Sequence, residues 1–146
     1  MSAPERPLRR RGLLDTSVVI DLERIPAARV PAEVAVSALT VAELAAGPHA
    51  TADAQGRARR QDRLQRVEAL FEPIPFGIDA ARAHGRVFAA TAAAGRSARG
   101  AGALDLLLAA GAVAEGLALF TRNPPDFAHL AEIVQVVPRE AEARVP

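Results

Sequence analysis

Three acidic residues lie in apolar surroundings, where a carboxylate is unusual. Asp15 ends the apolar run LLD, Glu43 lies within TVAELAAG, and Asp105 lies within GALDLLLAAGAVA. Desolvation of a charge costs on the order of several kcal/mol, so ionised side chains are rarely buried unless they are paired or bind a metal. No basic residue stands three or four positions from Glu43 or Asp105, and Asp15 has only Arg11 at that spacing. Local ion pairs therefore do not account for these acids, and we expect them to bind a cation.

Each acid also has a purely structural interpretation. Asp15 could cap the helix that follows it, because aspartate is among the preferred N-cap residues. Glu43 could complete a capping box by bonding back to the amide of Thr40. Asp105 could stabilise the first turn of its helix, where the helix dipole favours an anion by about 0.3–1 kcal/mol. For each acid taken singly, the sequence leaves these alternatives open.

The elements that must position the acids alternate between strands and helices. Apolar runs predict strands at 13–14, 34–37, 74–76, 117–121 and 133–137, and helices are predicted at 18–24, 40–47, 52–71, 79–94 and 104–114, the fourth of them capped by Asp79. Strands and helices that alternate at this spacing favour a parallel sheet covered on both faces. The sequence thus predicts one α/β domain of three layers, α/β/α, with a central parallel sheet of about five strands.

The three acids should converge at one edge of this sheet. Asp15 ends a strand, and ligands of open α/β sheets bind outside the carboxyl ends of the strands, at the topological switch point. Glu43 and Asp105 begin helices, and the N-terminal ends of helices packed on the sheet face the same edge. Carboxylates that lie close together repel one another unless a cation neutralises them. Because the ligands are oxygens, a hard divalent ion is expected, either Mg²⁺ or Mn²⁺.

Composition excludes several other kinds of chemistry. The chain has 146 residues, the size of one domain, and its lack of cysteine excludes disulfides and zinc–thiolate sites. All 18 basic residues are arginine, which excludes P-loop nucleotide binding, Schiff-base catalysis and receiver-type phosphoacceptor domains, since each needs a lysine. A haloacid-dehalogenase-type phosphatase would need a second aspartate at position 17, where this chain has Ser17.

The two ends of the chain differ in pattern from its middle. We expect a disordered basic arm at 1–11, a folded domain at 12–138 and a C-terminal tail at 139–146. No apolar run approaches the roughly 20 residues of a membrane span, and no signal-peptide core follows the basic N-terminus. We therefore expect a cytoplasmic protein without a membrane partner.

Histidines and arginines provide alternative functional groups. His49, His84 and His129 are candidates for acid–base chemistry in a metal-free nuclease, although ordinary surface or boundary positions also explain them. The arginine-rich stretch at 57–66 is interpreted as the solvated face of a helix, with RNA contact as the alternative. The loop at 95–100 is basic through Arg96 and Arg99, and arginine suits contacts with phosphate.

Four blocks along the chain resemble, in order and spacing, the signature blocks of PIN-domain proteins. They are LLDTSVVID at 13–21, SALTVAEL at 37–44, ALDLLLAAGA at 103–112 and FTRNPPDF at 120–127. The likeness is greatest to the VapC toxins of bacterial VapBC toxin–antitoxin pairs. The resemblance implies a PIN fold and a Mg²⁺-dependent endoribonuclease that cleaves cellular RNA, with Mn²⁺ as the alternative ion.

The resemblance also implies roles for the acids. Asp15, Glu43 and Asp105 would be the core catalytic and metal-binding residues, and Asp126 would be the fourth. We expect Asp15 and Asp105 to hold the principal ion. Glu43 would bind it through water or act as the general base, and Asp126 would complete a second site.

Three polar residues complete the set that the resemblance implies. The hydroxyl of Thr16 would steady the first block, and Thr121 and Asn123 would lie behind the metal ligands or towards the substrate. Some members of the family carry an acid at the position of Asn123, which therefore competes with Asp126 for the fourth place.

The expected partners follow from the same resemblance. They are a small VapB-type antitoxin whose C-terminal segment covers the acidic site, an RNA substrate and a second copy of the chain in a homodimer. The helices at 40–47 and 52–71 could hold the antitoxin. The alternative function is a catalytically weak PIN domain that acts mainly as a binding partner of an antitoxin and operator DNA.

Overall fold

A parallel sheet of four strands positions the candidate site in this computed structural model, which describes residues 11–139. The strands are β1 Arg11–Leu14, β2 Glu33–Val36, β3 Ala118–Thr121 and β4 Val136–Pro138. Their order is β2-β1-β3-β4, so β1 and β3 are the central pair. Leu14 of β1 is in register with Val36 of β2 and with Phe120 of β3. The chain leaves β1 towards β2 and later returns to the other side of β1, which places the topological switch point between β1 and β3.

The sheet has one strand fewer than the sequence predicts. The segment at 74–76 forms only an isolated parallel bridge, in which the N–H of Ile74 donates to the carbonyl of Val36 at 2.8 Å. The carbonyl of Ile74 accepts from the N–H of Ala38 at 2.9 Å. Pro75 follows at once and has no N–H to extend a ladder. The predicted fifth strand is therefore wrong, and the bridge lies beyond β2.

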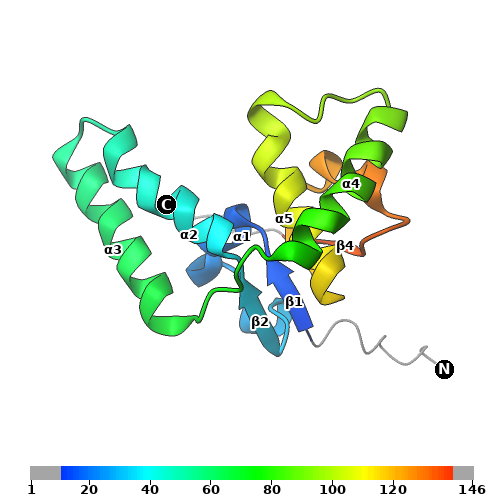
Figure 1. The fold of residues 1–146 in the computed structure, drawn as a ribbon. Coiled ribbons are helices and arrows are strands. Elements are labelled where there is room, and N and C mark those ends of the chain that lie inside the picture. The colour runs from blue at the N-terminus through cyan, green and yellow to red at the C-terminus, as the bar shows by residue number, and fades with distance from the viewer. Residues whose placement is uncertain (1–10, 140–146) are drawn as a thin grey trace.

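The helices form the two outer layers of the predicted three-layer fold. Their bounds are α1 Thr16–Ile20, α2 Ala38–Ala46, α3 Ala54–Leu70, α4 Ile78–Ala93 and α5 Ala103–Glu115. Successive residues of a strand point to opposite faces of a sheet. Leu13 accordingly packs against α4 and α5, whereas Leu14 packs against α1, α2 and α3. Figure 1 shows the same division, with α3 and α2 on one side of the strands and α4 and α5 on the other.

Two glycines allow the close approaches that this packing needs. Gly12 of β1 lies against the ring of Phe120, and a Cβ atom at this position would overlap that ring. Gly116 ends α5 with φ 64°, the left-handed conformation that glycine adopts without strain. The chain therefore turns directly from α5 into the buried strand β3.

Several predicted boundaries need correction. The helix predicted at 18–24 ends as α1 at Ile20, and a short 3₁₀ segment follows at Leu22–Arg24. The N-cap of α4 is Gly77, so Asp79 lies in the first turn and does not cap the helix. Arg11, which the prediction assigned to the arm, begins β1. The rest of the predicted arm and most of the tail at 139–146 lie outside the described residues.

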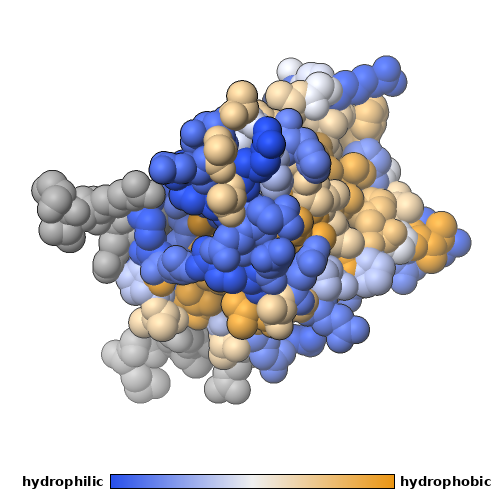
Figure 2. All heavy atoms as spheres, turned by 90° about the vertical axis from the view of Figure 1, so that its left-hand side faces the viewer, coloured by the Kyte–Doolittle hydropathy of each residue, from blue (hydrophilic) through white to orange (hydrophobic). Residues whose placement is uncertain are grey.

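The most polar layer is formed by α3. Leu64 and Val67 face the core, while the arginines of the 57–66 stretch are exposed or partly exposed. Figure 2 views the side on which α3 lies and shows a mainly hydrophilic surface there. Arg60 also has a structural role, because its guanidinium donates to the carbonyl of Gly47 at 2.9 Å. Within residues 11–139, no helix combines the length and apolar character needed to cross a membrane.

Candidate active site

Asp15 follows β1 directly at the switch point of the sheet. Its side chain is buried with 4% exposure, and its backbone N–H donates to the carbonyl of Phe120 at 2.9 Å. The Oδ2 atom accepts hydrogen bonds from the hydroxyls of Ser17 at 2.7 Å and Thr121 at 2.8 Å. Both donors are neutral, so they orient the carboxylate and leave its negative charge uncompensated.

The position of Asp15 is that of an N-cap, but its side chain does not act as one. Asp15 precedes the first residue of α1, yet its carboxylate makes no hydrogen bond to the N–H groups of that helix. The carboxylate instead bonds to Thr121, which ends β3. The capping interpretation of Asp15 is therefore wrong.

Glu43 projects from α2 towards the first turn of α1. Its Oε1 atom accepts a hydrogen bond from the hydroxyl of Thr16 at 2.7 Å. The hydroxyl oxygens of Thr16 and Thr40 are 3.0 Å apart. Because the single hydroxyl hydrogen of Thr16 is donated to Glu43, Thr40 must donate to Thr16.

The capping box that was the structural alternative for Glu43 is not formed. The N-cap of α2 is Ser37, whose hydroxyl accepts from the N–H of Leu39 at 3.0 Å. Thr40 lies inside the helix, and its hydroxyl is fully buried against Thr16. The carboxylate of Glu43 is therefore directed to the end of β1 and does not stabilise the start of its own helix.

Asp105 lies in the first turn of α5, as predicted. Its pKa is raised to about 6, first by burial and then by the negative charges of Asp15, Glu43 and Asp126. An aspartate stabilised only by a helix dipole would show no such repulsion. Asp15, Glu43 and Asp126 therefore lie close enough to Asp105 to repel its negative charge.

Asp126 lies at the open side of the site. It ends the 3₁₀ segment Pro124–Asp126 and is exposed. Together with Asp105 it lines a cavity of about 520 Å³, whose other polar lining residues are Thr91, Arg96, Ser97, Arg99 and His129. Asn123 is exposed nearby, and its backbone N–H donates to the hydroxyl of Thr121 at 3.0 Å. Thr121 thus connects the loop of Asn123 and Asp126 to Asp15.

The four acids suit a divalent cation by their chemistry. Their ligand atoms are carboxylate oxygens, and the ion pairs within the described part of the chain involve other acids. Mg²⁺ is typically bound through one or two carboxylates, with waters in its remaining positions. Among residues 11–139, no three acidic or histidine side chains are already arranged to hold one ion. The site therefore offers charge and oxygen ligands without a preformed ligand cluster.

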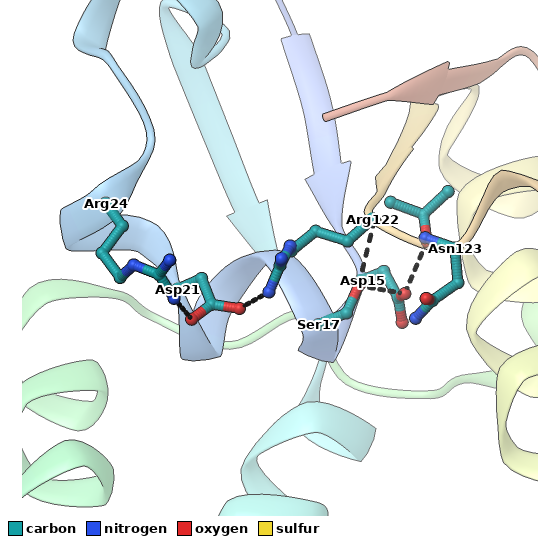
Figure 3. Close-up of polar contacts among 7 residues, drawn as sticks. Asp15, Ser17, Asp21, Arg24, Arg122 and Asn123 are labelled. Atoms are coloured by element: carbon teal, nitrogen blue, oxygen red, sulfur yellow. Dashed lines mark hydrogen bonds and ion pairs between the residues drawn. The ribbon is translucent and has the colours of Figure 1, made fainter. Parts of the chain in front are cut away.

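An ion-pair network holds the side chain of Arg122 against Asp21. The backbone N–H of Arg122 donates to the hydroxyl of Ser17 at 3.1 Å, while its guanidinium bonds to Asp21. Arg24 also contacts Asp21, at 3.3 Å. Figure 3 shows the guanidinium of Arg122 directed towards Asp21, on the side away from Asp15.

Comparisons with known proteins show the family to which this fold belongs. A sequence profile of the PIN domain matches residues 12–133. The chain belongs to the PIN-domain family. Ribonuclease VapC5 of Mycobacterium tuberculosis is 38% identical over 133 residues, which cover 86% of this chain and 95% of that protein. This similarity identifies the PIN domain as one of the VapC type.

Solved structures extend the likeness of this PIN domain to three dimensions. VapBC-5 from Mycobacterium tuberculosis, a member of the VapBC family of toxin–antitoxin systems, matches with a TM-score of 0.77 and 36% identity over 88% of this chain and 98% of that one. FitAcB from Neisseria gonorrhoeae matches with a TM-score of 0.67 and 28% identity over 86% of this chain and 95% of that one. The predicted PIN-like α/β fold is thereby confirmed.

The structure links most of the predicted site residues of this PIN domain to one another. Thr121 contacts Asp15, and Thr16 contacts Glu43. Asp105 and Asp126 share a cavity, and Asn123 reaches the site only through the hydrogen bond of its backbone. The roles of these seven residues in metal binding and catalysis stay predictions.

Sequence reasoning missed the residues that orient the acids. Ser17 and Thr40 each donate a hydrogen bond within the site, although their sequence positions gave no indication of that role. Asp21 lies within the helix predicted at 18–24, and no role in the site was predicted for it. The only sequence signal for Asp21 is its spacing of four residues from Ser17, which places both on one face of a helix.

Proposed function

We propose that this PIN domain is a Mg²⁺-dependent endoribonuclease and the toxin of a VapBC-type pair. The observation that carries the proposal is the gathering of Asp15, Glu43, Asp105 and Asp126 at one edge of the sheet. Burial and, after it, repulsion by the other three acids raise the pKa of Asp105, and a bound cation would relieve that repulsion. The 38% identity to Ribonuclease VapC5 supports RNA as the substrate. Ribonucleases of the PIN-domain family depend on metal ions, and the oxygen ligands here favour Mg²⁺, with Mn²⁺ as the alternative.

The proposed roles follow from where each acid lies. Asp15 and Asp105 would hold the principal ion, which supplies an activated water and stabilises charge on the phosphate oxygens. Glu43 would accept a proton from that water or bind the ion through one. Asp126, the most exposed acid, would act at a second site towards the substrate, with Asn123 beside it.

Three hydroxyl groups would serve the reaction by orienting these carboxylates. Ser17 and Thr121 fix Oδ2 of Asp15, and Thr16 fixes Oε1 of Glu43. Each of these donors is neutral, so the site keeps the negative charge that a divalent ion needs. Preorganised ligands of this kind avoid a reorganisation cost when the substrate arrives.

A VapB-type antitoxin is the proposed protein partner, by likeness to VapBC-5. A groove of about 200 Å³ runs between α1 and α3, lined by Val19, Ile20, Leu22, Val67, Leu70 and Phe71 together with charged residues. Ile20 is 42% exposed and Leu70 is 72% exposed, so both offer apolar surface to a partner. Homodimerisation remains a prediction, for which light scattering of the purified chain is the direct measurement.

A binding role without useful nuclease activity is the second candidate. The observation that favours it is the absence, among the described residues, of acids already arranged to hold one ion. In this case the protein would form its antitoxin complex with no need of a metal. The two candidates therefore differ in what happens when Mg²⁺ is supplied.

A magnesium titration on antitoxin-free protein separates these candidates. Purified wild type would be incubated with total cellular RNA at increasing Mg²⁺, with EDTA and Asp105→Asn as controls. If the protein is a nuclease, RNA cleavage should increase with Mg²⁺ concentration, stop in EDTA and be absent with Asp105→Asn. Intact RNA at every Mg²⁺ concentration, together with complex formation in EDTA, would overturn the nuclease and support the binding role.

A further inference from the structure

The cavity beside Asp105 has a basic wall as well as an acidic one. Asp105 and Asp126 line one part of it, and Arg96 and Arg99 line another. Both arginines belong to the loop between α4 and α5 and are exposed. A ligand in this cavity would meet carboxylates and guanidinium groups together. A phosphodiester beside metal-binding acids is a ligand of this kind, because its anionic oxygens can be divided between a metal and an arginine.

The guanidinium of Arg96 is held by two uncharged acceptors. Its Nη1 atom donates to the carbonyl of Pro125 at 2.9 Å and contacts Nδ1 of His129 at 3.3 Å. These contacts use both hydrogens of Nη1. Within residues 11–139, no partner is found for Nε or Nη2, and Arg96 forms no ion pair with an acid of that range. The charge and one fork of donors, Nε–H and Nη2–H, are therefore available for a bidentate contact with phosphate.

The proton of His129 is fixed by its neighbours. The hydroxyl of Thr91, a residue with 1% exposure, donates to the carbonyl of Val87 at 2.8 Å. Because that donation uses its only hydrogen, Thr91 must accept from Nε2 of His129, which lies 2.9 Å away. Burial and, secondarily, the charge of Arg96 lower the pKa of His129, which favours the neutral ring. Its Nδ1 atom is then free of hydrogen and accepts from Arg96.

We propose that Arg96 binds a backbone phosphate of the RNA in the cavity beside Asp105, and that His129 is the positioning residue that holds its guanidinium there. This inference rests on the proposed function for the identity of the ligand. A chain of hydrogen bonds runs from Arg96 through His129 and Thr91 to the carbonyl of Val87 in α4. An arginine held in this way loses less conformational freedom on binding than an unrestrained one.

RNA binding in EDTA tests Arg96 without any catalytic step. The probe is a fluorescently labelled, single-stranded RNA pool of random sequence, and the matched control is Arg82→Gln, which removes an exposed arginine of α4 outside the cavity. We expect Arg96→Gln to weaken binding about fivefold to tenfold and to reduce the slope of log affinity against log salt by about 0.7. We expect Arg82→Gln to bind like the wild type. If Arg96→Gln and wild type bound RNA with the same affinity and the same salt dependence, the proposed contact between Arg96 and phosphate would be overturned.

The same variants distinguish failure of this inference from failure of the proposed function. If wild type cleaves RNA with Mg²⁺ and Arg96→Gln binds RNA with wild-type affinity, the proposed phosphate contact is wrong, but the proposed nuclease function is supported. If wild type never cleaves RNA but Arg96→Gln binds more weakly, the contact stands and the nuclease is wrong.

Two substitutions at His129 isolate its positioning role. His129→Asn and His129→Leu both lose the contact with Thr91, but only asparagine keeps an acceptor near the place of Nδ1. For His129→Leu we expect a KM for RNA raised about threefold to fivefold, with kcat nearly unchanged, because a binding contact is weakened before the chemical step. His129→Asn should recover most of that loss, although both variants lose similar thermal stability.

A double variant completes the test of coupling. If His129 acts through Arg96, adding His129→Leu to Arg96→Gln should weaken RNA binding no further than Arg96→Gln alone, since the two changes remove one interaction. Additive losses of affinity, or equal defects in His129→Asn and His129→Leu, would show that His129 does not position Arg96.

Discussion

Asp15 and Asp105 lie at the same edge of the sheet, but they are held in opposite ways. Asp15 is 4% exposed and accepts hydrogen bonds from Ser17 and Thr121. Asp105 is partly exposed and accepts no hydrogen bond from the described residues, and its pKa is raised to about 6 by burial and by the other acids. Hydrogen bonds from two neutral hydroxyls therefore orient and stabilise the carboxylate of Asp15. The carboxylate of Asp105 has no such donor among the described residues and would be stabilised by a bound cation.

This difference separates structural from chemical roles among residues of one type. A buried carboxylate with two donors contributes to folding, because its hydrogen bonds replace those it made with water. A carboxylate that is repelled by its neighbours lowers the stability of the metal-free protein. It contributes favourably only when a cation binds and offsets the repulsion. Substitution of the two aspartates should therefore have the same effect on catalysis and opposite effects on stability.

The largest expected effect is on RNA cleavage by Asp15→Asn and Asp105→Asn. A metal ion contributes several kcal/mol to phosphodiester cleavage, so loss of either ligand should reduce the single-turnover rate with Mg²⁺ by about 1000-fold or more. In EDTA, Asp15→Asn should lower the free energy of unfolding by about 2 kcal/mol, because it weakens charge-assisted hydrogen bonds. Asp105→Asn should unfold at the same or a higher urea concentration than wild type.

The control for this pair is Glu68→Gln, the same chemical change at an exposed position of α3. It should leave both the cleavage rate and the urea midpoint unchanged. Loss of stability in Asp105→Asn comparable with that in Asp15→Asn would contradict the comparison, since it would give both acids a structural role.

Thr121→Val should have the next largest effect, and on stability. The hydroxyl of Thr121 is fully buried, donates to Asp15 and accepts from the backbone N–H of Asn123. Valine keeps the volume but leaves the buried carboxylate with one donor fewer and the loop without its acceptor. We expect a loss of about 2 kcal/mol in the free energy of unfolding, measured by urea denaturation in EDTA. Thr121→Ser, which keeps the hydroxyl, should recover most of the loss.

The contrast between the two acids also explains how far the sequence could predict the site. The acids were found because a charge between apolar residues is visible in the linear sequence, as at Asp15 and Asp105. The donors were not all found, because a hydroxyl such as that of Ser17 or Thr40 also suits a helix terminus. Only the pairing of β1 with β3 shows that Asp15 lies beside Thr121 and that its carboxylate is turned away from its own helix.

The fold was predicted best where burial alone determines an element. The strand β3 and the helix α5 are almost entirely apolar, and each of their ends was predicted to within one residue. The strand β1 begins two residues earlier than predicted, because Arg11 and Gly12 also pair with β2. The segment at 74–76 is also apolar, but Pro75 limits it to one bridge. The link from Arg96 to His129 joins a loop to the 3₁₀ segment Ala128–Leu130, and no periodic pattern in the sequence indicates such a contact.

The pH dependence of stability gives a smaller test, carried out without metal. The pKa of Asp105 is raised from 3.8 to about 6 in the folded protein, so between these values the folded state holds a proton that the unfolded state has released. This group therefore makes the free energy of unfolding fall as pH rises from about 4 to about 6, and its penalty is complete above that range. Solvent around the partly exposed carboxyl should keep this effect smaller than that of Thr121→Val.

Asp105→Asn is the variant that isolates this dependence. Its stability relative to wild type should increase from pH 4 to pH 6 and then stay constant, as measured by urea denaturation at a series of pH values in EDTA. A constant difference over the whole range would mean that Asp105 does not titrate there.

The smallest expected effect concerns Arg122, whose backbone is bonded to Ser17 beside Asp15. Asp21 binds the guanidinium of Arg122, whose backbone N–H is already bonded to Ser17 within the site. Asp21→Asn removes the charge that holds Arg122, and the partly exposed pair should contribute less than about 1 kcal/mol to stability. The released guanidinium would be attracted to the acids at the sheet edge and compete there with a cation.

We expect Mg²⁺ to bind to Asp21→Asn about twofold to fourfold more weakly than to wild type, as measured by calorimetry. The double variant with Arg122→Gln should regain wild-type affinity. Unchanged Mg²⁺ affinity in Asp21→Asn would mean that Arg122 does not reach the acids, and that only the neutral donors around Asp15 control its charge.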